Sequence, residues 1–239
     1  MDSVSWLQNG YELVSTRDGS PTLRALLSAG AEDMHHSGGA WSETRQIYGR
    51  LIAPAFEALE HPRFLSLGLG LGYNETLIAQ HALKFKKPWS CVSYESDPVL
   101  IQAFELALED RHPAGEIQET YARIFGAIEE PVKDELLGAL AEGRWILEGA
   151  LTPGGRPVPP FQVDAYLWDA FSQRTSPGLW EESFLLEFFA SSASRGWCGL
   201  SSYACVGSLK RALKACGFNV ESLEGFHGKR NSTLAFRQP

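Results

Sequence analysis

The sequence lacks any uninterrupted apolar run long enough to cross a membrane, and residues 1–5 lack the basic start of a signal peptide. These absences predict a soluble, cytoplasmic protein. Cysteine is also scarce, because the 239 residues include only four cysteines, with no C-x-x-C pair and no histidine cluster near them. We therefore expect buried, reduced thiols and no metal. The adjacent His35 and His36 would point apart on a helix or a strand, so no metal site is expected there either.

The sequence also has fewer basic residues than acidic ones. The formal net charge is −8 at pH 7, from 21 lysines and arginines against 29 aspartates and glutamates. This balance argues against a general nucleic-acid binder, since attraction to phosphates normally requires a basic surface. The charge is uneven, however, because residues 206–239 carry six lysines and arginines against two glutamates. A local basic patch on an acidic body is compatible with the composition.

A glycine-rich turn is the strongest motif in the chain. The apolar residues 64–67 lead into Gly68, Gly70 and Gly72, and a helical pattern follows at 75–82. In parallel α/β folds, a strand that ends in glycines before a helix N-terminus is typical of a nucleotide site. The third glycine comes one residue earlier than in the dinucleotide fingerprint, and this spacing is typical of S-adenosylmethionine enzymes. A flexible turn without a ligand is the alternative interpretation.

Strands and helices alternate along most of the chain. We expect a β-hairpin at 11–27 and strands at 64–67, 89–95, 145–148, 161–168, 197–201, 218–223 and 232–236. Helices are expected at 43–59 with Ser42 as N-cap, and at 75–82, 98–109, 131–141, 180–191 and 205–215. The pattern predicts one α/β domain over 1–239, with a doubly wound, mostly parallel sheet and residues 1–40 as an N-terminal hairpin extension. Residues 149–160, rich in proline and glycine, are expected to form a surface loop.

Two carboxylates are expected at the carboxyl ends of strands, where such sheets bind their ligands. Glu95 lies 23 residues after Gly72, close to the spacing at which nucleotide-binding folds place a ribose-binding acid. It could instead stabilise the start of the helix that Asp97 and Pro98 begin. Asp169 follows the strand 161–168 and could either reach a ligand or cap the next loop.

Four segments, in order, resemble the methyltransferase component of the MnmC family of tRNA 5-methylaminomethyl-2-thiouridine biosynthesis proteins. They are residues 18–23 with 34–43, the turn 68–74, residues 164–171 with Pro177 and Trp180, and residues 225–230. The resemblance includes stand-alone relatives that lack the flavin-dependent oxidase half. It implies a Rossmann-like methyltransferase fold, S-adenosylmethionine as cofactor, and the aminomethyl group of a wobble uridine in tRNA as substrate. A separate oxidase would then have to supply that amine.

Candidate site residues follow from the motifs and the resemblance together. The cofactor-binding candidates are Glu43, Gly68, Gly70, Gly72, Tyr73, Asn74, Glu95, Glu148 and Asp169. Asp169 is also the catalytic candidate, because methyl transfer to an amine needs a group that orients the amine more than it needs a strong base.

Four further residues are candidates for substrate binding. Phe171 and Trp180 could stack on a flipped-out nucleotide, and Lys229 and Arg230 could hold its phosphate. The alternative for the Lys229–Arg230 pair is a solvated turn, and Tyr73 could equally belong to the core.

The chain departs from the family pattern at several positions. Ser66 stands where most of these enzymes place an acidic residue two positions before the first glycine. Gln173, Thr175 and Ser176 replace the family's Pro, Lys and Asn after Asp169. Two alternatives therefore stay open: a methyltransferase that acts on a small molecule or a protein, and a protein of this fold that binds the cofactor without catalysis.

Overall fold

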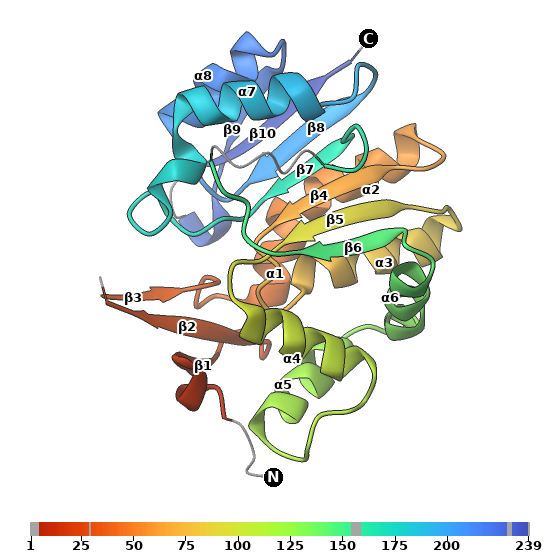
Figure 1. Ribbon diagram of the computed structural model, residues 1–239, viewed down its shortest axis with the longest axis vertical. Helices are drawn as coiled ribbons and strands as arrows, with labels where there is room; N and C mark the ends of the chain where they lie inside the picture. Colours follow the sequence, from red (N-terminus) through yellow and green to blue (C-terminus); the bar gives the residue numbers. More distant parts are fainter. Residues whose placement is uncertain (1–4, 29, 154–158, 229–230, 239) are drawn as a thin grey trace.

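A seven-stranded sheet forms the centre of the molecule (Figure 1). This computed structural model describes residues 5–28, 30–153, 159–228 and 231–238. The strands are β4 (Arg63–Leu67), β5 (Ser90–Tyr94), β6 (Trp145–Glu148), β7 (Ala165–Trp168), β8 (Cys198–Ser202), β9 (Asn219–Leu223) and β10 (Ser232–Arg237). Their order across the sheet is β6-β5-β4-β7-β8-β10-β9. Strands β4 to β8 pair in parallel, and β10 is antiparallel to both β8 and β9.

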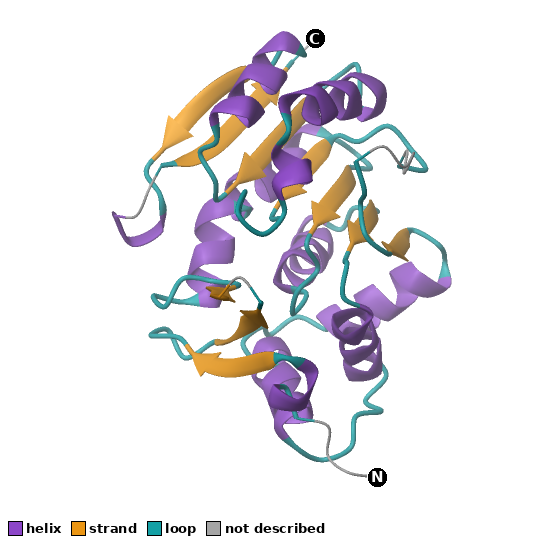
Figure 2. Ribbon diagram, turned by 60° about the vertical axis from the view of Figure 1, so that its left-hand side comes forward, coloured by secondary structure: helices purple, strands orange, loops and turns teal. Residues whose placement is uncertain are grey.

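Helices cover both faces of this sheet, as predicted (Figures 1 and 2). One face packs against α1 (Ala40–Ile47), α2 (Gly49–Ala58), α3 (Tyr73–Phe85), α4 (Pro98–Leu108), α5 (Glu116–Phe125) and α6 (Val132–Ala141). The other face packs against α7 (Glu182–Ser192) and α8 (Gly207–Ala215). Successive strand residues serve opposite faces: Phe64 belongs to the first core cluster and Leu65 to the second. Burial on both faces explains why the strands are nearly continuous apolar runs.

A small antiparallel sheet precedes the main one and is set apart from it in Figure 2. Strands β1 (Tyr11–Ser15) and β2 (Pro21–Leu27) form the predicted hairpin, which Gly19 turns at a φ of 85°. A third strand, β3 (Gly30–Asp33), pairs with β2 and was not predicted. Its residues are mostly exposed and include no large apolar side chain, so they carry no alternation from which a strand could be inferred.

The predicted helix at 43–59 is wrong in its start and its continuity. The structure begins α1 at Ala40, with Gly39 as N-cap, and starts a second helix at Gly49. Ser42 lies inside the first turn and is not the cap. The hairpin turn caps this helix instead, because Ser20 Oγ accepts the Ala40 N–H at 2.9 Å and Asp18 accepts the Ser42 N–H at 2.9 Å. A cap supplied by a distant segment leaves no local signal in the sequence.

Other boundaries differ by a few residues. The strand predicted at 161–168 is shorter in the structure, where β7 begins only at Ala165. Before it, Val163 forms an isolated β-bridge with Ala193. Trp180 ends a short 3₁₀ turn, η2 (Pro177–Trp180), before α7 begins. Of the predicted loop 149–160, residues 154–158 lie outside the described part of the chain.

All four cysteines are free, as expected, although only Cys91 and Cys198 are buried. Across the described ranges, no helix has the length and apolar character needed to span a membrane.

Candidate functional site

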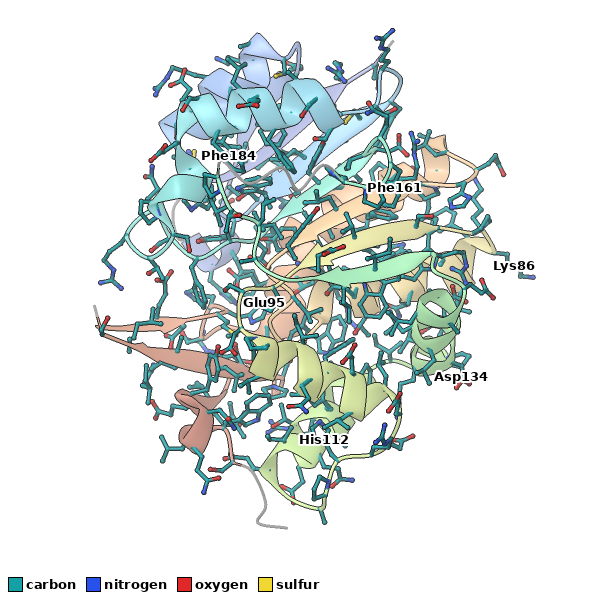
Figure 3. All side chains as sticks on the ribbon, in the orientation of Figure 1. Lys86, Glu95, His112, Asp134, Phe161 and Phe184 are labelled. Atoms are coloured by element: carbon teal, nitrogen blue, oxygen red, sulfur yellow. The ribbon has the colours of Figure 1, made fainter. Side chains whose placement is uncertain are left out.

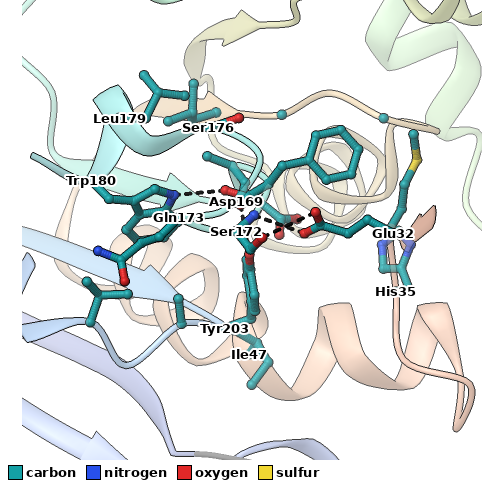
Figure 4. Close-up of a pocket in the computed structure, with 18 of the residues that line it drawn as sticks. Glu32, His35, Ile47, Asp169, Ser172, Gln173, Ser176, Leu179, Trp180 and Tyr203 are labelled. Carbon is teal, nitrogen blue, oxygen red and sulfur yellow. Dashed lines mark hydrogen bonds between the residues drawn. The ribbon is translucent and has the colours of Figure 1, made fainter. Parts of the chain in front are cut away.

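A cleft of about 1610 Å³ lies at the carboxyl ends of the parallel strands. Its lining comes from the segment between β3 and α1, the glycine turn, the end of β5, the loop after β7 and the start of α8. Figure 3 shows Glu95 near this edge of the sheet, and Figure 4 shows the part of the cleft around Asp169. The topology places the cleft where parallel α/β sheets bind their ligands.

The glycine turn adopts backbone conformations that favour glycine at three positions. Gly68, Gly70 and Gly72 have φ values of 90°, 53° and 77°. A Cβ at Gly68 would lie 2.6 Å from the Asp169 carbonyl oxygen, and one at Gly72 would lie 1.9 Å from the Phe104 ring. Gly68 and Gly70 line the cleft, whereas Gly72 lies outside its lining. Position 72 therefore requires glycine because a side chain there would clash with Phe104 of α4, and not because the residue faces the cleft.

Glu95 lies beside this turn and faces the cleft. Its carboxylate accepts hydrogen bonds from the Gly70 N–H at 3.0 Å and the Asp97 N–H at 3.0 Å. Asp97 is the N-cap of α4, since it accepts the Val99 N–H at 2.9 Å, as predicted. Both interpretations of Glu95 are therefore compatible with the structure, because one carboxylate contacts the glycine turn and the start of the next helix.

Asp169 lies directly after β7 and is partly buried at the floor of the cleft. The Asn74 side-chain amide donates to its carboxylate at 3.1 Å. Burial raises the pKa of Asp169 to about 7, and the nearby charges of Glu43 and Glu75 raise it further, against the lowering effects of Tyr48 and Asn74. The carboxyl therefore titrates in the range where a group that handles an amine proton is most useful.

Tyr48 belongs to this site and was missed by the sequence reasoning. Only 2% of the residue is exposed, and it lines the cleft beside Asp169. It lies at the junction of α1 and α2, which the sequence pattern merges into one helix. A helix junction that faces a distant strand end is a tertiary feature, so no spacing rule could have selected this tyrosine.

The N-terminal segment closes one side of the cleft. Glu43, in the first turn of α1, accepts the His36 N–H at 2.6 Å. Burial lowers the pKa of His35 to about 4, so this histidine is neutral at pH 7. The Tyr73 hydroxyl donates to the Pro21 carbonyl at 2.6 Å, and Tyr73 lines the cleft while 98% of it is buried. Tyr73 is thus both a core residue and part of the cleft wall.

Glu32 of β3 joins the small sheet to the loop after β7, and the sequence reasoning did not identify it. Its carboxylate accepts the backbone N–H of Ser172 at 3.0 Å and the Ser172 hydroxyl at 3.2 Å (Figure 4). It also accepts the Thr175 hydroxyl. In the same loop, the Trp180 indole N–H donates to the Phe171 carbonyl at 2.8 Å. Only 1% of Trp180 is exposed, so its ring supports the loop and offers little surface for stacking. Phe171 is partly exposed and lines the cleft.

Among the described candidates, Glu148 and Gly72 lie outside the cleft lining. Glu148 is exposed at the end of β6 and lies outside the cleft lining, and its carbonyl accepts the Glu95 N–H at 3.1 Å. Glu148 was predicted as a cofactor contact, but its side chain is exposed to solvent. Lys229 and Arg230 lie outside the described residues, whereas Phe226 and Asn231 on either side line the cleft.

A buried carboxyl lies close to the position where Ser66 departs from the family. Glu75, in the first turn of α3, is fully buried and accepts the Ser93 hydroxyl at 2.7 Å, while Ser93 accepts the Trp145 indole N–H at 3.0 Å. Burial raises the pKa of Glu75 to about 7, and the neighbouring Ser93 and Ser66 hydroxyls lower it. A carboxyl group therefore sits beneath the glycine turn, supplied by α3 and not by β4.

The cleft is acidic. The carboxylates in its lining are Glu32, Asp33, Glu43, Glu95 and Asp169, and Arg174 is the one lysine or arginine among the described lining residues. Such a surface attracts cations and disfavours anionic groups near the floor. A sulfonium or an amine suits this environment.

Known proteins with similar sequences include methyltransferases, as this fold would suggest. A family model described as "S-adenosyl-L-methionine-dependent methyltransferase" matches residues 155–238. The chain is 27% identical, over 237 residues, to the tRNA 5-methylaminomethyl-2-thiouridine biosynthesis bifunctional protein MnmC of Aromatoleum aromaticum, covering 91% of this chain and 34% of that protein. An uncharacterized protein of Methanocaldococcus jannaschii is 27% identical over 241 residues, or 99% of this chain and 62% of that protein. The chain thus spans about a third of the length of the MnmC relative.

A solved structure extends the similarity to three dimensions. MnmC2 from Aquifex aeolicus matches 95% of this chain and 70% of its own with a TM-score of 0.67 and 25% identity. The predicted resemblance, the α/β fold and the cofactor class are confirmed by these findings. The chain is therefore similar to the S-adenosyl-L-methionine-dependent methyltransferases over residues 155–238, and over most of its length it resembles the methyltransferase portion of the MnmC relatives.

Proposed function

We propose that this chain is an N-methyltransferase that converts the 5-aminomethyl group of a wobble uridine or 2-thiouridine in tRNA to methylaminomethyl. The observation that carries the proposal is Asp169 at the floor of an acidic cleft, beside the glycine turn. The name of the MnmC relative supports the choice of acceptor. A separate oxidase that supplies the primary amine, and a cytoplasmic location, belong to the same proposal.

The cleft fits S-adenosylmethionine. Gly68 and Gly70 leave no side chain between the turn and a ligand, and the Glu95 carboxylate faces the same space. Pockets for single ligands usually measure about 300–1,000 Å³, so a cleft of about 1610 Å³ leaves room for a cofactor and part of an acceptor. Glu43, Tyr73 and the Asp169–Asn74 pair would complete the binding surface. The cofactor, when bound, supplies a methyl group already activated by its sulfonium.

The residues of the chain then have to position and desolvate the reacting groups. An amine reacts through its neutral lone pair, and the Asp169 carboxylate can accept one N–H and hold it in line with the methyl group. The same carboxylate stabilises the ammonium that forms. Phe171, half-exposed in the cleft wall, offers a ring on which a flipped-out base can stack. Lys229 and Arg230 remain predicted phosphate contacts.

The test is transfer of a labelled methyl group from S-adenosylmethionine to tRNA that carries unmethylated aminomethyluridine. We expect label at the wobble uridine and a loss of at least about a hundredfold in the Asp169→Asn variant. Binding should also weaken steeply with salt if three or four phosphates are contacted. Cofactor binding without transfer to any tRNA would contradict the proposal and leave the non-catalytic alternative.

A second candidate acceptor is an amine on a small molecule or a protein. The net charge of −8 and the five carboxylates of the cleft favour it, because both weaken attraction to polyphosphate. Transfer to a free amine at a rate that salt does not change, with no transfer to tRNA, would support this candidate.

A further inference from the structure

Two polar atoms at the floor of the cleft are buried without hydrogen-bond partners of normal geometry among the described residues. They are the Tyr48 hydroxyl and the Asn74 side-chain carbonyl oxygen. Tyr48 is 2% exposed and Asn74 is 3% exposed, and both residues line the cleft. Native structures rarely leave buried polar atoms unsatisfied, because the lost hydration is not recovered. Such atoms at a cleft floor indicate a partner that arrives with a ligand.

Both side chains lie against the same carboxylate, that of Asp169. The Asn74 amide nitrogen donates to Asp169, and a carboxylate can only accept, so the amide orientation follows from this contact. Tyr48 lies beside the same carboxylate. The neighbouring Tyr203 hydroxyl is already used, since it donates to the Ala170 carbonyl at 2.9 Å. The Tyr48 hydroxyl and the Asn74 side chain therefore flank the Asp169 carboxylate at the floor of the cleft.

We propose that Tyr48 and Asn74 complete, with Asp169, a three-oxygen cradle for an aliphatic amine nitrogen. This inference rests on the proposed function for the identity of the acceptor. A neutral primary amine donates its two N–H bonds to two of these oxygens and keeps its lone pair free. In the transfer, a C–N bond forms and the S–CH₃ bond breaks, the sulfur keeps the electron pair, and the secondary ammonium retains both protons. The same oxygens accept those two N–H bonds in the product.

Two sources could supply the nitrogen: the acceptor's aminomethyl group, or the α-amino group of the cofactor's methionine part. Both are aliphatic amines and would satisfy the same oxygens. Both unpartnered atoms are shielded from bulk water in this structure. The experiment therefore has to separate cofactor affinity from acceptor handling.

The decisive variant is Tyr48→Phe, which removes one oxygen and its contact with the Asp169 carboxylate but keeps the buried ring, so the fold should tolerate it. Tyr121→Phe is its matched control, because the Tyr121 hydroxyl is equally buried and unpartnered but lies outside the cleft lining. Calorimetry measures the affinity for S-adenosylmethionine and S-adenosylhomocysteine, and single-turnover assays measure methyl transfer to aminomethyluridine tRNA. Asn74→Ala removes the second oxygen and also the amide that donates to Asp169. If Tyr48→Phe lowers cofactor affinity or the rate of methyl transfer, Asn74→Ala should lower the same quantity further.

If the cradle holds the acceptor, Tyr48→Phe keeps both cofactor affinities within about twofold and slows transfer about tenfold or more. If it holds the cofactor, both affinities weaken about tenfold, and an analogue without the α-amino group binds the wild type and the variant alike. Tyr121→Phe should change neither quantity.

A failure of the proposed function is recognised separately, as absence of transfer by the wild type. The cradle is then tested without turnover, by binding of 5-aminomethyluridine to the S-adenosylhomocysteine complex. The inference is overturned if Tyr48→Phe matches the wild type in cofactor affinity, in nucleoside binding and in any measured transfer.

Discussion

The Glu32 carboxylate accepts hydrogen bonds from both the backbone N–H and the hydroxyl of Ser172, 140 residues later in the chain. This contact ties the small N-terminal sheet to the loop that follows Asp169. The loop also carries Phe171, which lines the cleft. The N-terminal sheet therefore holds the loop on this side of the cleft, although it is no part of the central sheet.

Replacing Glu32 should release this loop. Glu32→Ala removes a charged acceptor that serves Ser172 and Thr175, so the loop should open more often and trypsin should cut after the exposed Arg174 about tenfold faster. Cofactor affinity should stay within about twofold. Asp33→Ala is the control, because Asp33 is a neighbouring carboxylate of β3 that pairs with Arg24 instead. Equal cleavage rates in the two variants would show that Glu32 does not hold the loop.

Methyl transfer should increase with pH through about 7. The pKa of Asp169 is raised to about 7, mainly by burial, and only the carboxylate form can accept an N–H from an amine. Single-turnover rates between pH 5.5 and 8.5 would show this rise. Asp169→Asn should abolish it and leave only the limb that reports ionisation of the acceptor amine at higher pH. A rise centred near 7 that persists in Asp169→Asn would assign it to another group.

Glu75→Gln should stabilise the protein at alkaline pH. The pKa of this buried carboxyl is raised from 4.5 to about 7, so the folded state binds its proton more tightly than the unfolded state does. Its contribution to stability is complete below about pH 4.5 and is lost as the pH rises through about 7. The shift corresponds to about 3 kcal/mol at most. Urea unfolding at pH 5.5 and 8.5 should therefore depend less on pH in Glu75→Gln than in the wild type, and equal dependence would refute this account.

A carboxylate introduced at Ser66 should be tolerated only if Glu75 is neutralised. Both positions are fully buried and adjacent, so Ser66→Asp adds a second acid to one unsolvated site and should cost about 3 kcal/mol or more. The double variant Ser66→Asp, Glu75→Gln should recover much of that loss and keep cofactor affinity. If the stability loss of the double variant in thermal unfolding equals the sum of the losses of the two single variants, the two positions do not compensate for each other.

Two glycines of the turn should respond differently to alanine. Gly72→Ala brings a Cβ against the Phe104 ring at a positive φ, and we expect a loss of stability of about 2–4 kcal/mol. Adding Phe104→Leu should restore part of it. At Gly70 the nearest atom to a new Cβ is the Met34 sulfur, 3.6 Å away, so only the left-handed backbone is strained, by about 1–2 kcal/mol. We expect Gly70→Ala to lose less stability than Gly72→Ala and to weaken cofactor affinity. Calorimetry measures the cofactor affinity of both variants, and chemical unfolding measures their stability. An equal loss of stability in Gly70→Ala and Gly72→Ala would contradict this prediction.

Much of the fold could be predicted because its signals are local. The alternation of apolar runs and helical patterns, the Asp97–Pro98 helix start and the 68–72 glycine spacing each involve residues a few positions apart. They require only neighbouring side chains and backbone sterics, which every conformation of the chain shares. The two strand-end carboxylates, Glu95 and Asp169, reach the cleft for the same reason, since the strands that carry them are locally encoded.

Contacts between distant segments were decided only by the tertiary structure. Ser20 caps α1 from the hairpin, Glu32 holds Ser172, and Tyr48 meets Asp169 at the cleft floor. Glu75 becomes a buried carboxyl beside Ser66 only after α3 packs on β4 and β5. The sequence by itself determined the sheet, the glycine turn and the acids at its edge. The partners that tune those acids were determined by packing, because burial and hydrogen bonding depend on which segments meet and not on the spacing of residues along the chain.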